Sequence, residues 1–173
     1  MRKRVLILVA AVLLALVLAV PASACQWARF SAVGTETGNG EGVIAVKPAG
    51  NGNWCLITVR GETRYEGDLD GIGPYEYHSL TKGPCSEAVP GAFAETFWVE
   101  KWFNGKLLGR QGTLRASCAG QFYLDEPKRW ESRCVLKGES GKLAGLQGTM
   151  EWKGLFSEMG TRSYWGKVYW DSK

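Results

Sequence analysis

The sequence is poor in the residues that build metal sites and thiol-dependent catalytic sites. His78 is the single histidine, and no two of the five cysteines form a Cys-x-x-Cys pair. Zinc sites need several such ligands at short spacing, and a cysteine nucleophile needs a base beside it. The sequence therefore predicts no metal site and gives no sign of thiol catalysis.

A long hydrophobic segment is also missing. The longest apolar run, Val5–Val20, is shorter than the ~18 to 20 residues that a membrane-spanning helix needs. It follows the basic segment 2–4 and precedes the small residues Ala22-Ser23-Ala24. This order is typical of a secretory signal peptide. We expect a signal peptide at 1–24, a mature domain at 25–173, and a secreted or extracytoplasmic protein of a bacterial cell envelope.

Cleavage after Ala24 makes Cys25 the first mature residue. A lipidated cysteine at this position would tether the protein to a membrane. The lipoprotein signal usually carries Leu, Val or Ile three residues earlier, where this chain has Ala22. Lipidation of Cys25 and free secretion both stay open.

An excess of charge of one sign is missing once the signal peptide is removed. The chain has 21 Lys and Arg residues against 17 Asp and Glu, and three of the basic residues lie within the first four positions. The mature chain keeps 18 basic and 17 acidic residues, a net charge of +1. Binding to a polyanion is driven by an excess of positive charge, so we expect no nucleic-acid partner.

Apolar residues at three- and four-residue spacing are scarce in the mature chain, which argues against long helices. Alternation at a period of two is frequent, and all 23 glycines and eight tryptophans fall in the mature part. Short alternating segments separated by turn residues are typical of an antiparallel barrel or sandwich. The predicted strands are Trp54–Arg60, Thr63–Leu69, Tyr75–Leu80, Phe93–Phe103, Thr113–Cys118, Trp130–Leu136, Leu146–Trp152 and Tyr164–Trp170, with Phe30–Val33 and Val43–Val46 as further candidates.

Turn residues and cysteines predict how these strands connect. Asp70-Gly71 and Asn104-Gly105 are favoured hairpin dipeptides. Cys118 and Cys134 flank another turn-like stretch, so antiparallel strands on either side bring them opposite each other.

Cys55 and Cys85 are equally distant from Asp70. Cysteines of exported proteins are usually disulfide-bonded, and we expect the pairs Cys118–Cys134 and Cys55–Cys85.

Five local motifs follow one another between residues 63 and 171. They are Gly67-Asp68-Leu69-Asp70-Gly71, Tyr75-Glu76-Tyr77, Glu100-Lys101-Trp102, Gly109-Arg110-Gln111-Gly112-Thr113-Leu114, and the run from Gly138 to Gly148 that contains Leu143-Ala144-Gly145-Leu146. This succession resembles a bacterial family of unknown function in the allene oxide cyclase barrel-like superfamily. The last motif is the most specific of the five.

The resemblance implies a fold and a mode of action. It implies an all-β domain, one small antiparallel β-barrel of about eight strands with an enclosed interior. The plant allene oxide cyclases and the dirigent proteins of this superfamily handle hydrophobic small molecules in the barrel without a metal or organic cofactor, which implies no cofactor here. No catalytic residue of the cyclases maps onto this sequence. The chain departs from the family in its cysteines, its export signal and its many tryptophans.

Glu76 and His78 alternate onto one face of a predicted strand. If that face lines the interior, they form a potential acid–base pair in a low-dielectric cavity; if it faces outward, they are solvated surface groups. Tyr75 and Tyr77 on the opposite face are more typical of a core, which favours the outward orientation.

Glu100 lies between Trp98 and Trp102 on one face of the longest aromatic strand. A carboxylate between indoles can bind the polar end of an apolar ligand, or a sugar stacked on a ring. The simpler alternative is that the indoles fill the barrel with Glu100 at its rim. Trp165 and Trp170 fall on opposite faces, so at least one indole is expected to face solvent or a loop.

Three functions stay open on the sequence alone. We favour a non-catalytic exported barrel that binds a small hydrophobic or amphipathic molecule in its interior, with Glu76, His78, Trp98, Glu100 and Trp102 as candidate ligand-binding residues. The second is a cofactor-free isomerase or cyclase that uses Glu76, His78 or Glu100 as acid–base groups. The third is a structural or interaction domain with a filled barrel. The sequence leaves the ligand and the oligomeric state open.

Overall fold

The computed structural model of the chain describes residues 26–87 and 95–171. The predicted signal peptide at 1–24 and Cys25 lie outside the described residues. Most of the described chain is in β-strands, with two 3-10 turns. The elements are β1 (Ala28–Glu36), β2 (Gly42–Ala49), η1 (Gly50–Gly52), β3 (Trp54–Gly67), β4 (Leu69–Lys82), β5 (Glu95–Leu107), β6 (Arg110–Tyr123), β7 (Arg129–Gly141), β8 (Leu146–Leu155), η2 (Phe156–Glu158) and β9 (Thr161–Trp170).

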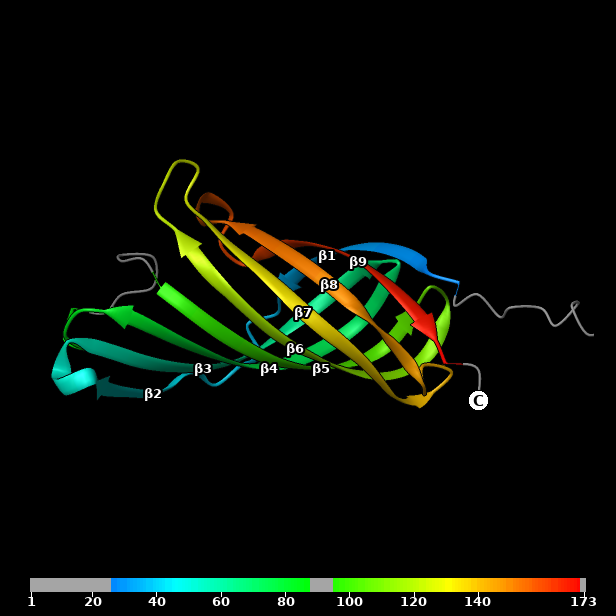
Figure 1. The fold of residues 1–173 in the computed structure, drawn as a ribbon, viewed down its shortest axis with the longest axis horizontal. Coiled ribbons are helices and arrows are strands. Elements are labelled where there is room, and N and C mark those ends of the chain that lie inside the picture. Colours follow the sequence, from blue (N-terminus) through cyan, green and yellow to red (C-terminus); the bar gives the residue numbers. More distant parts are fainter. Residues whose placement is uncertain (1–25, 88–94, 172–173) are drawn as a thin grey trace, which may run out of the picture.

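The strands form one antiparallel sheet in which eight strands close into a barrel (Figure 1). The sheet order is β1-β9-β8-β7-β6-β5-β4-β3-β2. The barrel closes because residues 32–36 of β1 pair with residues 63–67 of β3. Strand β2 pairs with the first half of β3, residues 54–60, and lies outside the closed barrel. The predicted all-β, eight-stranded antiparallel barrel is confirmed, with β2 as one additional strand.

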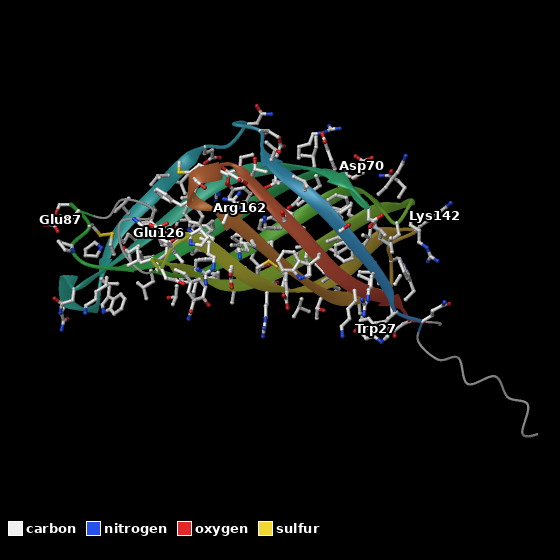
Figure 2. The ribbon with its side chains drawn as sticks, turned by 90° about the horizontal axis from the view of Figure 1, so that it is seen from above. Trp27, Asp70, Glu87, Glu126, Lys142 and Arg162 are labelled. Carbon is white, nitrogen blue, oxygen red and sulfur yellow. A yellow bond between two sulfur atoms is a disulfide. The ribbon has the colours of Figure 1, made fainter. Side chains whose placement is uncertain are left out.

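Two ends of the barrel can be distinguished (Figure 2). Asp70 and Lys142 lie at one end, next to the β3–β4 and β7–β8 connections. Glu87 and Glu126 lie at the opposite end, next to the segment after β4 and the β6–β7 connection. The strands therefore run from one end to the other and expose one face of the sheet to solvent.

Alternation of apolar and polar residues explains why these segments are strands. Along β5, Val99 and Phe103 are buried, whereas Trp98 and Trp102 are exposed. Successive side chains of a strand point to opposite faces, and in a small barrel the inward residues fill the interior. One side of each strand therefore builds the core and the other builds the surface.

Both predicted disulfides are present. Cys118 of β6 lies directly opposite Cys134 of β7, with Cα atoms 3.9 Å apart, and the two are bonded. Cys55 of β3 is bonded to Cys85, which follows β4. The first bond staples two neighbouring strands, and the second fixes the segment that leaves the β3–β4 hairpin.

Two turn predictions are wrong. Asp70-Gly71 lies within β4, because β3 ends at Gly67 and the connection is Asp68. Asn104-Gly105 lies within β5, and the turn follows at Leu108-Gly109, where both residues have positive φ, 51° and 75°.

Close strand packing explains these glycines. Gly71, Gly105, Gly112 and Gly141 lie side by side across β4, β5, β6 and β7. A Cβ on Gly105 would lie 2.2 Å from the carbonyl oxygen of Asp70 and 2.7 Å from the nearest atom of a neighbouring aromatic ring. Glycine inside a strand marks a place where backbones approach closely or the sheet bends. The four glycines are therefore needed for close strand packing at this end of the barrel, not for a reverse turn.

We predict that Gly105→Ala destabilises the barrel by about 2 kcal/mol or more, because the new Cβ meets fixed backbone. Urea unfolding followed by far-UV circular dichroism measures the change. Gly109→Asn is the matched control. Its Cβ would enter open space, and asparagine tolerates the positive φ of that turn, so a loss of about 1 kcal/mol or less is expected. Equal losses in the two variants would contradict the packing explanation.

Candidate functional site

The five candidate residues named from the sequence lie together on the outer face of β4 and β5. Trp98 and Trp102 are 44% and 41% exposed. The ring of His78 stacks on Trp98 with centroids 4.9 Å apart. Glu76 and Glu100 lie opposite each other in the next cross-strand row. Glu76 and His78 have the outward orientation that Tyr75 and Tyr77 suggested.

Basic neighbours hold the two carboxylates of this face. Arg60 Nε donates to Glu76 at 2.9 Å, and His78 Nε2 lies 3.0 Å from the other carboxylate oxygen. The hydrogen bond from Arg60 lowers the pKa of Glu76 below its ordinary value. Arg115 Nε donates to Glu100, also at 2.9 Å. These groups form surface ion pairs and do not face a low-dielectric cavity.

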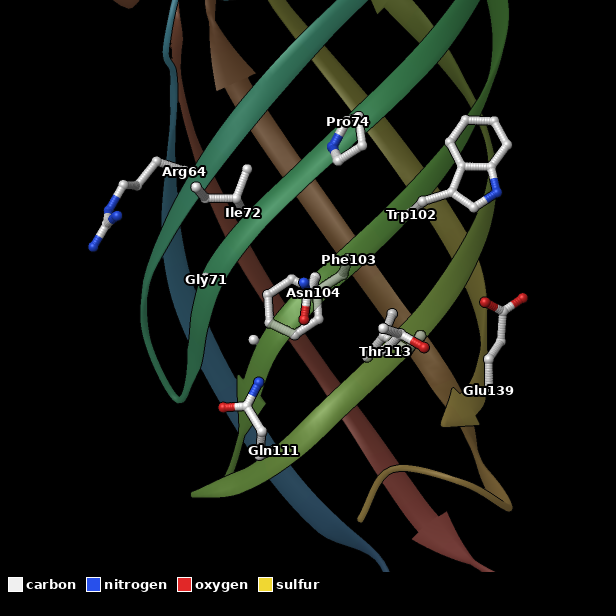
Figure 3. A pocket seen from close by; sticks show the side chains of 12 residues that line it. Arg64, Gly71, Ile72, Pro74, Trp102, Phe103, Asn104, Gln111, Thr113 and Glu139 are labelled. Carbon is white, nitrogen blue, oxygen red and sulfur yellow. The ribbon is translucent and has the colours of Figure 1, made fainter. Parts of the chain in front are cut away.

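Two hollows on the outer surface adjoin at Trp102 and Pro74, and together we call them the Trp102 trough. The larger hollow has a volume of about 720 Å³ and the smaller about 380 Å³; Trp102 and Pro74 line both. Figure 3 shows the larger hollow, in which the indole of Trp102 stands at one side. Its other side chains include Arg64, Ile72, Asn104, Gln111, Thr113 and Glu139, and the smaller hollow adds Asn39, Glu41, Arg60, Glu62 and Glu76.

Strand register places the centre of the larger hollow. Arg64, Ile72, Asn104 and Thr113 are successive cross-strand partners on β3, β4, β5 and β6. Sequence analysis missed this row because it ended the strands at the Asp-Gly and Asn-Gly dipeptides. The two-residue alternation that runs through Trp98, Glu100 and Trp102 reaches Asn104 next, so the signal was present in the outward face of β5.

A third hollow, of about 930 Å³, lies beside Trp165 on the β5–β9 side of the barrel. Ion pairs cross it: Arg133 with Glu151 at 3.5 Å, and Lys153 with Glu131 at 3.6 Å. Its charged groups bind one another, as Arg60 and Glu76 do in the smaller hollow of the Trp102 trough. We take the trough as the candidate site because two residues named from the sequence, Trp102 and Glu76, line it.

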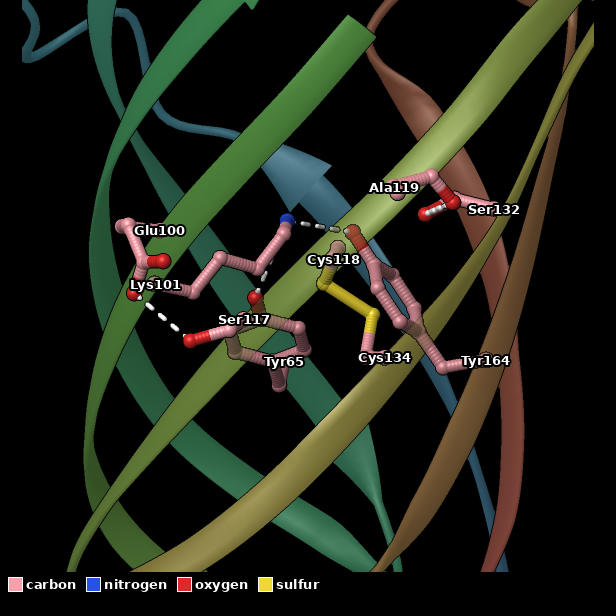
Figure 4. Close-up of a disulfide and its surroundings, with 9 residues drawn as sticks. All are labelled: Tyr65, Glu100, Lys101, Ser117, Cys118, Ala119, Ser132, Cys134 and Tyr164. Carbon is pink, nitrogen blue, oxygen red and sulfur yellow. Dashed lines mark hydrogen bonds between the residues drawn. A yellow bond between two sulfur atoms is a disulfide. The ribbon is translucent and has the colours of Figure 1, made fainter.

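Large side chains fill the barrel interior around a buried lysine (Figure 4). Lys101 is 4% exposed, and its Nζ donates to the hydroxyl of Tyr164 at 3.2 Å and to that of Tyr65 at 3.4 Å. The rings of Tyr65, Tyr75, Trp152 and Tyr164 have their centroids 5.2 to 5.9 Å from Nζ. Phenol oxygens and aromatic faces thus replace water around this amine.

An ion pair lies next to Lys101. Arg162 Nη1 donates to Glu36 Oε1 at 2.6 Å, and the hydroxyl of Tyr75 donates to the same oxygen at 3.0 Å. Burial by itself would raise the pKa of Glu36, but attraction and hydrogen bonding to Arg162, together with the bond from Tyr75, lower it overall. Burial lowers the pKa of Lys101 and raises that of Tyr65 and Tyr75.

The void beside Lys101 has a volume of about 10 Å³ and is lined by apolar side chains such as Phe30, Leu136 and Met150. This is room for about one water molecule. The sequence left open whether the barrel is hollow or filled; around Lys101 it is filled.

Within residues 26–87 and 95–171, no group of three or more His, Cys, Asp or Glu side chains could hold a metal ion. In the same ranges, no helix has the length and apolarity to cross a membrane.

We predict that Lys101→Met changes how stability depends on pH. Burial lowers the pKa of Lys101 in the native protein below the ordinary 10.5 of the unfolded chain. At pH values between the native and the unfolded pKa, the unfolded chain binds more protons than the native protein, so the free energy of unfolding rises with pH. Above about pH 10 the tyrosines reverse the slope, because burial raises the native pKa of Tyr65, Tyr75 and Tyr77 and the unfolded chain loses their protons first. The variant should lose the rise and keep the alkaline fall.

Urea unfolding at a series of pH values from 6 to 11 (about half a unit apart) tests this prediction. Lys106→Met, on the same strand but exposed, is the control and should retain the rise. A rise that persists unchanged in Lys101→Met would show that another group causes it.

Comparison with known proteins finds a similar fold among solved structures. No family model and no curated protein matches the chain. The fold is similar to that in the crystal structure of a protein of unknown function from the DUF3224 family of Shewanella oneidensis MR-1, with a TM-score of 0.57 and 20% sequence identity. The match covers 85% of this chain and 98% of that chain. A bacterial protein of unknown function therefore shares this barrel fold.

Proposed function

We propose that this chain is an exported, non-catalytic binding protein whose filled barrel carries a ligand site on its outer face, in the Trp102 trough. Export rests on the signal peptide predicted at 1–24. The two disulfides support it, because disulfides persist in oxidising compartments outside the cytoplasm. A lipid anchor on Cys25 and free secretion are both consistent with export.

One observation carries the proposal: an exposed indole stands where two hollows adjoin. Trp102 is 41% exposed and lies within β5, where it pairs with Arg115 of β6. On the β4 side the pairing is interrupted at Trp102 and Phe103, and it continues at Lys101 and Asn104. The backbone of Trp102 is therefore fixed before a ligand arrives, and little conformational entropy is lost on binding. Pro74 beside it is equally rigid. A flat apolar surface with rigid support is suited to stacking against a ring.

The charges around the trough indicate the ligand class. Carboxylates outnumber guanidinium groups along it: Glu41, Glu62, Glu76 and Glu139 against Arg60 and Arg64. An anionic ligand such as a fatty acid would be repelled there. Asn104, Gln111 and Thr113 supply neutral donors and acceptors beside the indole. The ligand that fits is an uncharged amphipathic molecule with one apolar face and several hydroxyls, as a sugar ring has.

The hypotheses drawn from the sequence receive less support. The favoured one, a ligand inside the barrel, has no room beside Lys101, where the void is about 10 Å³. The acid–base groups of the isomerase hypothesis lie on the solvent side: Glu76 and Glu100 pair with Arg60 and Arg115, and His78 Nε2 lies 3.0 Å from Glu76. We also propose that the chain belongs to the allene oxide cyclase barrel-like superfamily, on the motifs between 63 and 171 and on the eight-stranded closure.

The proposal predicts that the mature, disulfide-bonded protein binds members of a panel of neutral oligosaccharides. Isothermal titration calorimetry and the change in tryptophan fluorescence measure binding, with a long-chain fatty acid and a non-ionic detergent as comparison ligands. Trp102→Ala should weaken binding at least about tenfold, since a buried aromatic contact dominates such sites.

Trp165→Ala is the matched control, because that indole is similarly exposed, at 42%, but lies on β9, away from the trough. It should leave the affinity unchanged. Binding that is equally strong in Trp102→Ala, or that is confined to the fatty acid, would overturn the assignment of the trough.

A further inference from the structure

Strand β2 presents a free edge to solvent. It pairs with β3 along one edge, and among the described residues no strand pairs with its other edge. Figure 1 shows β2 at the border of the sheet, beyond the closed barrel. The other described strands each have partners on both sides, except that residues 28–31 of β1 pair with β9 alone. Among the described strands, β2 is therefore the one with an edge that is free along its whole length.

The side chains of this edge are apolar and β-branched. Val43, Ile44 and Val46 are 55%, 38% and 48% exposed. Exposed edges of this composition are templates for pairing with another chain, and monomeric proteins usually protect them. Ala45 between them is small and half-buried, so a strand could approach closely.

We propose that this edge is an interface at which β2 of a second copy of this chain pairs antiparallel, in a two-fold dimer. The flanking charges support this occupant. Glu41 precedes the apolar stretch and Lys47 follows it, and an antiparallel pair centred near Ile44 brings Lys47 of each copy beside Glu41 of the other. The edge is therefore its own complement, as a two-fold interface requires.

Two features limit the pairing to a short stretch. A bulge interrupts the β2–β3 register between Val43 and Ala45, and Pro48 has no backbone N–H to donate. Because β2 pairs with β2 of the other copy and uses up its free edge in doing so, pairing ends at two copies and does not continue into a fibre. The small size of the contact implies a dimer that dissociates on dilution.

The test is sedimentation analysis of the mature protein over a range of concentrations. Wild type should show a monomer–dimer equilibrium, and Ile44→Lys should be monomeric, since residue 44 lies opposite its own copy in the proposed register and the variant places two lysines directly across the interface. Val135→Lys is the matched control: Val135 is 66% exposed but lies on β7, which is paired on both sides, so the dimer should persist.

A charge exchange tests the orientation. Lys47→Glu should weaken the dimer, and adding Glu41→Lys to it should restore dimerisation. Near-UV circular dichroism checks that each variant keeps the native fold. Wild type that stays monomeric at high concentration, a dimer insensitive to Ile44→Lys, or assemblies larger than two would each overturn the proposal. Ile44 does not line the Trp102 trough, so failure here is distinguishable from failure of the ligand site.

Discussion

Closure of the barrel through β1 is the constraint on which the rest of the structure depends. β1 pairs with β9 on one side and with residues 63–67 of β3 on the other. This leaves residues 54–60 of β3 for β2, which lies beyond the ring. Closure also directs one face of eight strands into a small enclosed volume. Both the filled interior and the free edge of β2 are therefore consequences of a single strand pairing.

The hydrogen bonds of the buried Lys101 are consistent with closure of the barrel. Lys101 on β5 donates to Tyr65 on β3 and to Tyr164 on β9, strands that are not its neighbours in the sheet. The bond to Tyr164 spans the interior and depends on the closed ring, whereas Tyr65 lies only one strand beyond β4. A buried amine is costly unless its hydrogen bonds are made, so an opened barrel would leave Lys101 without the hydroxyl of Tyr164. The network therefore couples closure to the packing of several strands.

The two disulfides were predicted from turn positions and cysteine spacing. The interpretation in which Trp98 and Trp102 fill the barrel was wrong, because both indoles are exposed on the outer face. Sequence alternation located most of the strands and the outward face of Glu76 and His78. It failed at Asp70-Gly71 and Asn104-Gly105, because glycine serves a tight turn and a close strand contact equally well. A single sequence does not distinguish the two uses. Sequence analysis did not place Lys101 in the core, although it alternates with Val99 and Phe103 along β5, because a charge argues against a core position. Only the phenol hydroxyls from distant strands resolve that conflict.

A filled barrel interior is consistent with a proposed ligand site on the outer face. A hollow barrel would bind its ligand by enclosure, whereas a filled barrel provides a stiff outer surface on which an indole can be held in place. Glu41 lines the smaller hollow and directly precedes β2, so the proposed ligand site and the proposed dimer interface are neighbours. A dimer formed through β2 would therefore carry two trough sites on one particle. Two linked sites bind a repeating ligand, such as a polysaccharide chain, far more tightly than one site does, because the second contact is intramolecular.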